Sequence, residues 1–152
     1  MLFKRLSIRP NVTPRVRISI KETPMHIAIY ADAYSKSFNR LHQAITLAEL
    51  GRPPEVHSDV RRFCECFRAL VYHPDVIIMM PTSYAELKDL VAVRDLFANA
   101  RTIVILPERD ASVVSMGHLF HPSFITFNDE DFQDVAAILK HLCKHRRCRM
   151  DG

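Results

Sequence analysis

The chain has 152 residues, of which 48% are hydrophobic and 25% charged, which is an ordinary globular composition with enough length for one domain and a full core. No apolar run approaches the about 20 residues that span a bilayer. Lys4 and Arg5 are not followed by the apolar stretch of about 7–15 residues that a signal peptide requires. We therefore expect a cytoplasmic protein without a membrane span and with reduced cysteines.

The formal net charge of +4 is concentrated at the two ends of the chain. Residues 1–24 have a net charge of +5 and residues 140–152 of +4, whereas the stretch between them has −5. We predict a basic N-terminal arm or edge strand over 1–24, a compact domain over 25–145 and a basic tail over 146–152. Solvated ends are the simpler explanation of this pattern, and contact with nucleic acid or an anionic surface is the alternative.

Within the compact domain, short apolar runs alternate with segments of helical periodicity. "HIAIYA" (26–31) predicts a strand, and apolar side chains recur at helical spacing over 36–50 until Gly51 stops the helix. "PEVHS" (54–58) predicts a short strand, and 59–73 predicts a helix with one apolar stripe. "DVIIMM" (75–80) is the most apolar run, which indicates a central strand.

The same alternation continues to the end of the domain. A helix is predicted over 83–100, where Ser83 and Glu86 have capping-box spacing. A strand over 101–107, a short helix over 110–120, a strand over 122–127 and a last helix over 128–145 follow. Such alternation predicts an α/β fold with a doubly wound five-stranded parallel sheet in the flavodoxin-like order 2-1-3-4-5.

This arrangement resembles the receiver domain of response regulators, the CheY-like superfamily, over residues 25–145. "HIAIYAD" stands where receivers have a strand ending in two acids, and "HPDVIIMMP" where the strand carries the phosphorylated Asp. "RTIVILPE" and "PSFITFND" stand at the strands that carry a hydroxyl and a Lys. In that family the acids hold Mg²⁺, the strand 3 carboxylate accepts a phosphoryl group, and the hydroxyl and Lys bind its oxygens.

The residues at these positions depart from the family's pattern. The degenerate phosphorylation-site positions are Ala31, Asp32, Met79, Leu106 and Phe127. A thioether cannot be phosphorylated and binds Mg²⁺ poorly. The resemblance therefore implies a pseudo-receiver that lacks the phosphoacceptor Asp. Such a protein would be a signalling module related to two-component phosphorelays, without enzyme activity or cofactor, acting through contacts with a protein partner.

The resemblance also implies where such contacts are made. In receivers the fourth helix, fifth strand and fifth helix form the usual output and dimer face. In this chain that interaction face would run from Ser112 to Lys144, and a homodimer through it is an expectation. Its predicted members are Met116, Phe120, Phe124, Phe132 and Lys144.

A small-molecule site is the alternative function, because ligands of open α/β sheets bind outside the carboxyl ends of the strands. With only three glycines, the chain has no glycine-rich dinucleotide or NTP loop. Ser35, Lys36 and Ser37 could bind an anion at a helix start, although a plain N-cap is the more frequent use of such serines. The polar side chains that could hold a ligand are Tyr34, Ser35, Lys36, Thr82, Ser83, Glu108, Arg109, Asn128 and Asp129.

Other candidate constellations carry less weight, and no metal site is predicted. His141 and His145 have the i, i+4 spacing of a chelating pair, but a basic helix end explains them as well. Met79 and Met80 as soft metal ligands are outweighed by core packing. A catalytic pairing of His118 or His121 with an acid at 108 or 110 would rest on sequence proximity alone.

Overall fold

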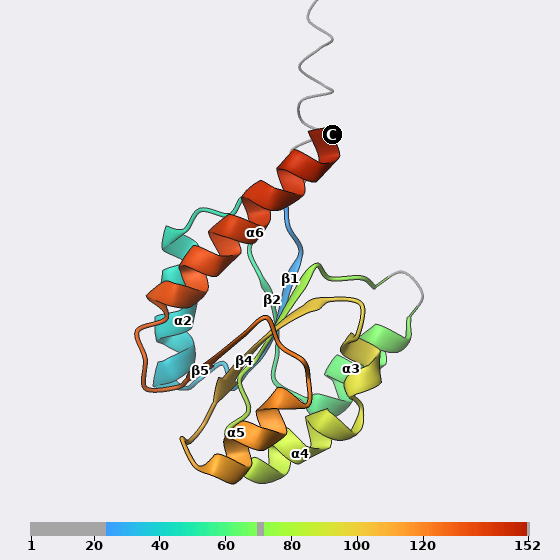
Figure 1. Ribbon diagram of the computed structural model, residues 1–152, viewed down its shortest axis with the longest axis vertical. Helices are drawn as coiled ribbons and strands as arrows, with labels where there is room; N and C mark the ends of the chain where they lie inside the picture. The colour runs from blue at the N-terminus through green and yellow to red at the C-terminus, as the bar shows by residue number, and fades with distance from the viewer. Residues whose placement is uncertain (1–23, 70–71, 152) are drawn as a thin grey trace, which may run out of the picture.

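The computed structural model describes residues 24–69 and 72–151, with side chains as far as Lys144 (Figure 1). The predicted arm over 1–24 lies outside the described residues except for Pro24. Five parallel strands form one sheet in the order β2-β1-β3-β4-β5, which confirms the predicted fold class and the central place of β3. The strands are β1 (Ile27–Tyr30), β2 (Glu55–His57), β3 (Val76–Met79), β4 (Arg101–Leu106) and β5 (Phe124–Phe127).

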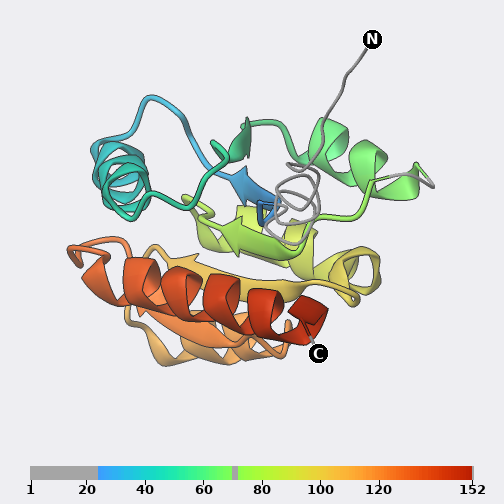
Figure 2. The ribbon, with the colours of Figure 1, turned by 90° about the horizontal axis from the view of Figure 1, so that it is seen from above.

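Helices cover both faces of this sheet (Figures 1 and 2). One layer contains α2 (Lys36–Leu47) and α6 (Gln133–Asp151). The other contains α3 (Val60–Arg68), α4 (Tyr84–Ala92), the 3-10 helix η1 (Arg94–Phe97) and α5 (Ala111–His118). No helix of the described residues combines the length and the apolar character that crossing a membrane requires.

Strand β3 is apolar throughout because both of its faces are covered. Ile77 and Met79 belong to the core under α3, α4 and α5, whereas Ile78 and Met80 belong to the core under α2 and α6. A strand buried on both sides has no solvent face, so the usual alternation of apolar and polar residues disappears. The same burial separates Met79 from Met80 onto opposite faces, which rules out a shared soft-metal site.

Four of the helices begin at a residue whose side chain accepts a hydrogen bond from the first turn. Ser83 and Asp110 cap α4 and α5, and Ser35 caps α2 through an N–H of Phe38 at 3.0 Å. These caps satisfy N–H groups that have no partner inside the helix. The chain therefore enters each helix directly from the loop that follows a strand end.

The helices do not match their predicted ranges: α2 ends at Leu47 instead of 50, and α3 ends at Arg68 instead of 73. The predicted helix over 83–100 is divided, since α4 ends at Ala92 and η1 then turns Phe97 into the core beside Phe63, with 5.6 Å between ring centres. The last helix begins at Gln133 instead of 128, after Phe132 at a φ of 65°. Its backbone continues through the predicted tail as far as Asp151.

A close approach joins α5 to β4. A Cβ placed on Gly117 would lie 3.1 Å from Cδ2 of Leu106, which is tighter than ordinary van der Waals contact. Leu106 is fully buried at the end of β4. The glycine therefore allows α5 to pack directly against the carboxyl end of β4.

Candidate functional site

The five residues that the sequence analysis predicted as a degenerate phosphorylation site lie at the carboxyl ends of β1, β3, β4 and β5. Ala31, Met79 and Leu106 are buried there, with at most 1% of each residue exposed. Asp32 is exposed, and its Oδ1 accepts a hydrogen bond from the N–H of Tyr34 at 3.0 Å. Phe127 is partly buried. The fold therefore brings these positions together, but it offers one carboxylate among them and seals three of the five from water.

Met79 is a core residue. It lies opposite Tyr30 and Val104 in the strand register, and it belongs to the same apolar cluster as Phe63 and Leu87. A buried thioether has no oxygen to which a phosphoryl group could be attached and no charge for a divalent cation to bind. The end of the central strand is therefore used for packing.

The first carboxylate that follows this strand end in the chain is that of Glu86, and it accepts three hydrogen bonds. Tyr30 donates its phenol to Oε2 at 2.6 Å, and Thr82 donates its N–H to Oε1 at 2.6 Å and its hydroxyl to the same oxygen at 3.2 Å. Burial, followed by the hydrogen bond to Glu86, raises the pKa of Tyr30 above its ordinary value. Glu86 thus links the end of β1 to the loop that leads from β3 into α4.

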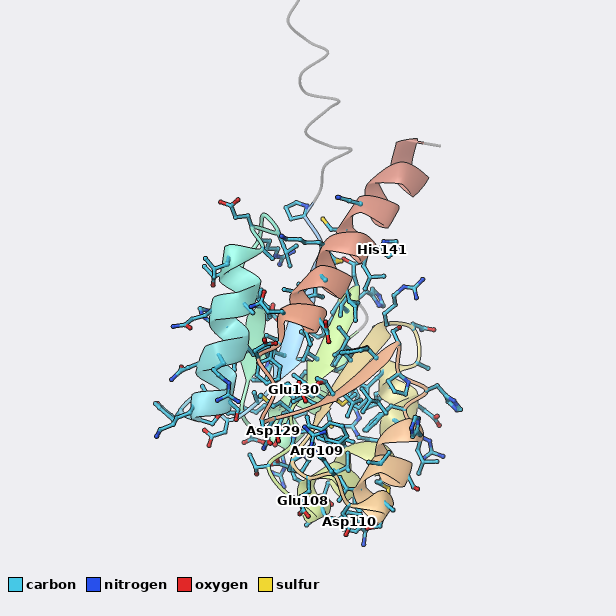
Figure 3. All side chains as sticks on the ribbon, turned by 60° about the vertical axis from the view of Figure 1, so that its left-hand side comes forward. Glu108, Arg109, Asp110, Asp129, Glu130 and His141 are labelled. Carbon is cyan, nitrogen blue, oxygen red and sulfur yellow. The ribbon has the colours of Figure 1, made fainter. Side chains whose placement is uncertain are left out.

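A second link joins the loops after β4 and β5 (Figure 3). Arg109 lies over the ring of Phe127, with 4.3 Å from its guanidinium carbon to the ring centre. Its Nη2 also donates to Oδ1 of Asp129 at 2.7 Å and to Oε2 of Glu130 at 2.8 Å. The hydrogen bonds that Arg109 donates to these two carboxylates raise its pKa, the one to Glu130 most. The cation at this edge is therefore already paired with acids.

The loop after β5 is also tied to α2. Ser37 donates its hydroxyl to the carbonyl of Asn128 at 3.1 Å, and Arg40 donates to the same carbonyl and to that of Glu130. Ser35 and Ser37 are thus both engaged within the protein. The expected N-cap is what the structure shows at Ser35.

The remaining polar candidates of the small-molecule hypothesis are exposed and do not converge on a cavity. Tyr34 is 96% exposed, and Lys36, Thr82, Ser83 and Glu108 also lie on the surface. The larger cavities lined by described residues lie elsewhere, at the amino ends of β3 and β4 and beside the end of α2. At the carboxyl edge, Met79 is fully buried and Arg109 lies over the ring of Phe127.

Only some of the residues of the predicted interaction face are exposed to solvent. Phe120 and Phe132 are core residues, so the prediction that these two side chains contact a partner is wrong, because each fills the space under a helix. Met116 and Phe124 are partly buried, and Lys144 is exposed. Leu119, which the sequence analysis did not select, is 43% exposed between α5 and β5.

A cluster that the sequence analysis missed lies around Glu55 on β2. Its Oε1 lies 3.2 Å from Nε2 of His57 and accepts a hydrogen bond from the phenol of Tyr72, while its Oε2 lies 3.6 Å from Nε2 of His26. Burial opposes ionisation of Glu55, but the hydrogen bonds from Tyr72 and His57 hold its pKa below the usual value. The i, i+2 spacing of Glu55 and His57 on a strand was the available signal.

The other sequence candidates do not form sites. His118 and His121 are exposed, and Asp110 is used as the cap of α5, where its hydrogen bonds from Ser112 lower its pKa. His141 lies at the far end of the domain from Arg109 (Figure 3), and the side chain of His145 lies outside the described residues. Among the described side chains, no three His, Cys, Asp or Glu are grouped as metal ligands.

No protein-family model matches the chain, and neither does any curated protein. Among solved structures, the chain is similar to the signal receiver domain of the response regulator NarL from Mycobacterium tuberculosis. Identity is 17% and the TM-score 0.57, over 80% of this chain and 98% of that one. It is also similar to the phosphorylated cyanobacterial phytochrome response regulator RcpA, at 10% identity and a TM-score of 0.58 over 78% and 91% of the two chains.

A third likeness is to CpaE2 of Sinorhizobium meliloti, a protein assigned to pilus assembly, at 16% identity and a TM-score of 0.53 over 81% of this chain and 99% of that one. All three likenesses extend over nearly the whole of the solved chains. At these sequence identities, the three likenesses are evidence for the fold alone. Together with the strand order, they show that the described part of the chain adopts the receiver-like, flavodoxin-type α/β fold.

Proposed function

We propose that this chain is a receiver-like signalling module that is not phosphorylated and that acts through contacts with a protein partner. The observation that carries the proposal is Met79, which is fully buried at the strand end where receivers carry the phosphoacceptor. Leu106 and Phe127 replace the hydroxyl and Lys that would bind phosphoryl oxygens. The receiver domains among the structural neighbours support a role in signalling.

The hydrogen bonds and ion pairs at the carboxyl ends of the strands support a single fixed arrangement of the loops there. In receivers the edge must admit Mg²⁺ and a phosphoryl group, whereas here Glu86 accepts from Tyr30 and Thr82, and Arg109 is paired with Asp129 and Glu130. Each polar group is therefore satisfied without a ligand. We expect the loops of this edge to keep one arrangement, and the chain to have no enzyme activity of its own.

The test is an NMR titration of the ¹⁵N-labelled protein with Mg²⁺, followed by beryllofluoride or acetyl phosphate. We expect no saturable shift at Asp32, Met79 or Leu106. The matched control is Asp32→Asn, because Asp32 is the one acidic residue among the five positions. Saturable shifts at the carboxyl edge that vanish in Asp32→Asn would show a working acidic pocket and would overturn the proposal.

The second part of the proposal is that the chain forms a homodimer through α5, β5 and α6. The exposed Leu119 and the partly buried Met116 extend this face between the two helices. Sedimentation equilibrium would test it with Leu119→Glu, which we expect to weaken a homodimer at least about tenfold. Lys36→Glu, on the surface of α2, is the control. A monomer at all concentrations would reject self-association and leave a different protein as the partner.

A further inference from the structure

The two basic ends of the chain meet at one end of the folded domain. Met25, which precedes β1, belongs to the same core cluster as Cys143 near the end of α6. Met25 and Leu142 also line one cavity of about 480 Å³ at the amino ends of the strands. Residues 1–24, with a net charge of +5, therefore join the domain beside residues 140–152, with a net charge of +4. The fold places side by side two charged segments that lie at opposite ends of the sequence.

The amino ends of the strands add a further cation to this region. Arg101, the first residue of β4, is exposed and lines the same cavity as Met25. Asp75 lines the cavity as well, but its Oδ2 accepts a hydrogen bond from the backbone N–H of His26 at 2.8 Å. We call the region formed by Met25, Arg101 and residues 140–151 of α6 the basic pole.

The other end of the domain is acidic. Exposed carboxylates lie where the chain leaves β1, β4 and β5, namely those of Asp32, Glu108, Asp110, Asp129, Glu130 and Asp131. Arg109 lies among them and is paired with two of these acids. In Figure 3 the labelled acids lie at the opposite end of the domain from His141 of α6. A polyanion is therefore attracted to the basic pole and repelled from the carboxyl ends of the strands.

Helix α6 extends beyond the core of the domain. Cys143 is buried, and the helical backbone continues past it to Asp151 (Figure 1). At about 1.5 Å per residue, about 12 Å of helix follows Cys143. Lys140 and Lys144 are exposed, and the sequence adds Arg146, Arg147 and Arg149. The helix dipole favours cations within the last turn alone, so it does not account for Lys140 or Lys144.

The residue types at the end of α6 favour a phosphate backbone over a lipid surface. Residues 144–151 read KHRRCRMD, in which only Cys148 and Met150 are apolar. A helix that lies on a membrane needs a wide apolar face, usually with Leu, Phe or Trp. Arginine instead binds phosphate oxygens through two parallel N–H groups. At about 3.6 residues per turn, the four Lys and Arg positions of 144–149 are distributed around the helix axis, which suits a groove with phosphates on both walls.

A DNA duplex fits this pole better than a single strand or an RNA duplex. Proteins that bind single strands stack the bases on exposed aromatic side chains. The exposed tyrosines of the described residues, Tyr34 and Tyr84, follow the carboxyl ends of β1 and β3, away from the basic pole. The major groove of B-form DNA is about 12 Å wide and admits an α-helix, whereas that of A-form RNA is too narrow for side chains to read.

We propose that the basic pole binds double-stranded DNA through the phosphate backbone and without a preference for sequence. The end of α6 enters the major groove, and Arg101 and the cations of residues 1–24 contact phosphates beside it. The acidic carboxyl ends of the strands face away from the duplex. The inference goes beyond the proposed function and does not rest on it, because neither Met79 nor Leu119 takes part.

The experiment is a fluorescence-anisotropy titration of a labelled DNA duplex of about 20 base pairs with the whole chain, from about 0.05 M to 0.3 M NaCl. We expect the logarithm of the affinity to fall linearly with the logarithm of the salt concentration, with a slope of about −0.9 for each phosphate neutralised. A duplex of scrambled sequence should bind within about twofold, and an RNA duplex or a single strand at least about fivefold more weakly. The absence of salt-dependent binding, equal binding of RNA, or binding to phosphatidylserine vesicles alone would overturn the proposal.

Two variants test the two basic ends of the chain. The triple variant Arg146→Gln, Arg147→Gln and Arg149→Gln keeps residues that favour a helix and removes three charges. We expect it to lose at least about tenfold in affinity at low salt, with a salt dependence smaller by about 2–3 phosphate contacts. Arg15→Gln combined with Arg17→Gln should lose at least about threefold, because residues 1–24 contact the same duplex. Unchanged affinity in this double variant would contradict the joint contact.

The matched control removes the same charge from the carboxyl end of the domain. It carries Lys36→Gln, Arg61→Gln and Arg62→Gln, at exposed positions in the first turns of α2 and α3. Its affinity for DNA should stay within about twofold of the wild type. Far-UV circular dichroism compares the helix content of each variant with that of the wild type. A control that loses as much affinity as the triple variant, or a folded triple variant with unchanged affinity, would contradict the assignment to the basic pole.

Discussion

The guanidinium carbon of Arg109 lies 4.3 Å from the centre of the Phe127 ring, and this contact joins the loop after β4 to the end of β5. The sequence predicts that Phe127 stands at the position at which receivers carry a Lys. The positive charge at this edge therefore comes from a different strand end, and it is held by Asp129 and Glu130. The guanidinium of Arg109 therefore forms an internal bridge between the loops after β4 and β5.

Replacing Arg109 by Gln should loosen this bridge and lower the melting temperature slightly, because both ion pairs are exposed. The difference from the wild type should shrink as NaCl is raised from about 0.05 M to 1 M, since salt screens exposed charges. Thermal unfolding at several salt concentrations measures it. A melting-temperature difference that grows with salt would mean that the two ion pairs do not stabilise the folded protein. Arg61→Gln, on the surface of α3, is the control.

An aspartate in place of Met79 should destabilise the folded protein. Met79→Asp places a carboxylate in a fully buried apolar cluster, so we expect a loss of at least about 3 kcal/mol in the free energy of unfolding. Met79→Leu keeps the volume and should cost less than about 1.5 kcal/mol. Urea unfolding compares the two. An aspartate variant as stable as the leucine variant would show that this strand end is open to water.

Stability should depend on pH through Glu55. Although burial opposes ionisation, hydrogen bonds from Tyr72 and His57 lower the pKa of Glu55 in the folded protein. A lowered pKa contributes stability that is present above the unfolded value of about 4.3 and is lost as the pH falls through the folded value. Glu55→Gln should therefore lose less stability than the wild type between about pH 5 and pH 3, as measured by urea unfolding. Parallel pH profiles for the two proteins would refute the role of Glu55.

Two tyrosines should resist ionisation while the protein is folded. Burial, together with a hydrogen bond to Glu86 or Glu55, raises the pKa of Tyr30 and of Tyr72. A raised pKa contributes stability below the unfolded value of about 10, and that contribution is lost as the pH rises. Absorbance at about 295 nm should show both phenols ionising only with unfolding. Tyr30→Phe and Tyr72→Phe assign the signals, and an early titration lost in either variant would contradict the expectation.

Gly117 should not tolerate a side chain. Alanine is favoured over glycine in a helix by up to about 1 kcal/mol. However, its Cβ would lie 3.1 Å from Leu106, which is fully buried and has little room to shift. We expect Gly117→Ala to destabilise the protein by about 1 kcal/mol net, because overpacking a core costs about 1–3 kcal/mol. Chemical denaturation measures it, with Ser115→Ala on the exposed side of α5 as the control. A stabilised Gly117→Ala variant would mean that Leu106 can move aside.

Much of the fold was determined by the sequence alone, because its signals are local. The apolar run at 76–80 predicted a central strand, and Ser35 and Ser83 predicted helix starts, since strand burial and N-capping depend on neighbouring residues. It stays a prediction from the alignment of strand ends that an acceptor is replaced by Met79. Its complete burial follows from the sheet being covered on both faces.

Only the tertiary structure decided which distant residues meet. Arg109 with Phe127, Tyr30 with Glu86 and Glu55 with His26 are pairs separated along the chain, and no local pattern specifies them. Tertiary packing also placed Phe120 and Phe132 in the core, because an apolar residue beside a helix end can face either a partner or its own sheet, and periodicity does not distinguish the two. The cavity at the amino end of β4 exists for the same reason: it is formed where η1 and the turn after α5 approach one strand from opposite sides.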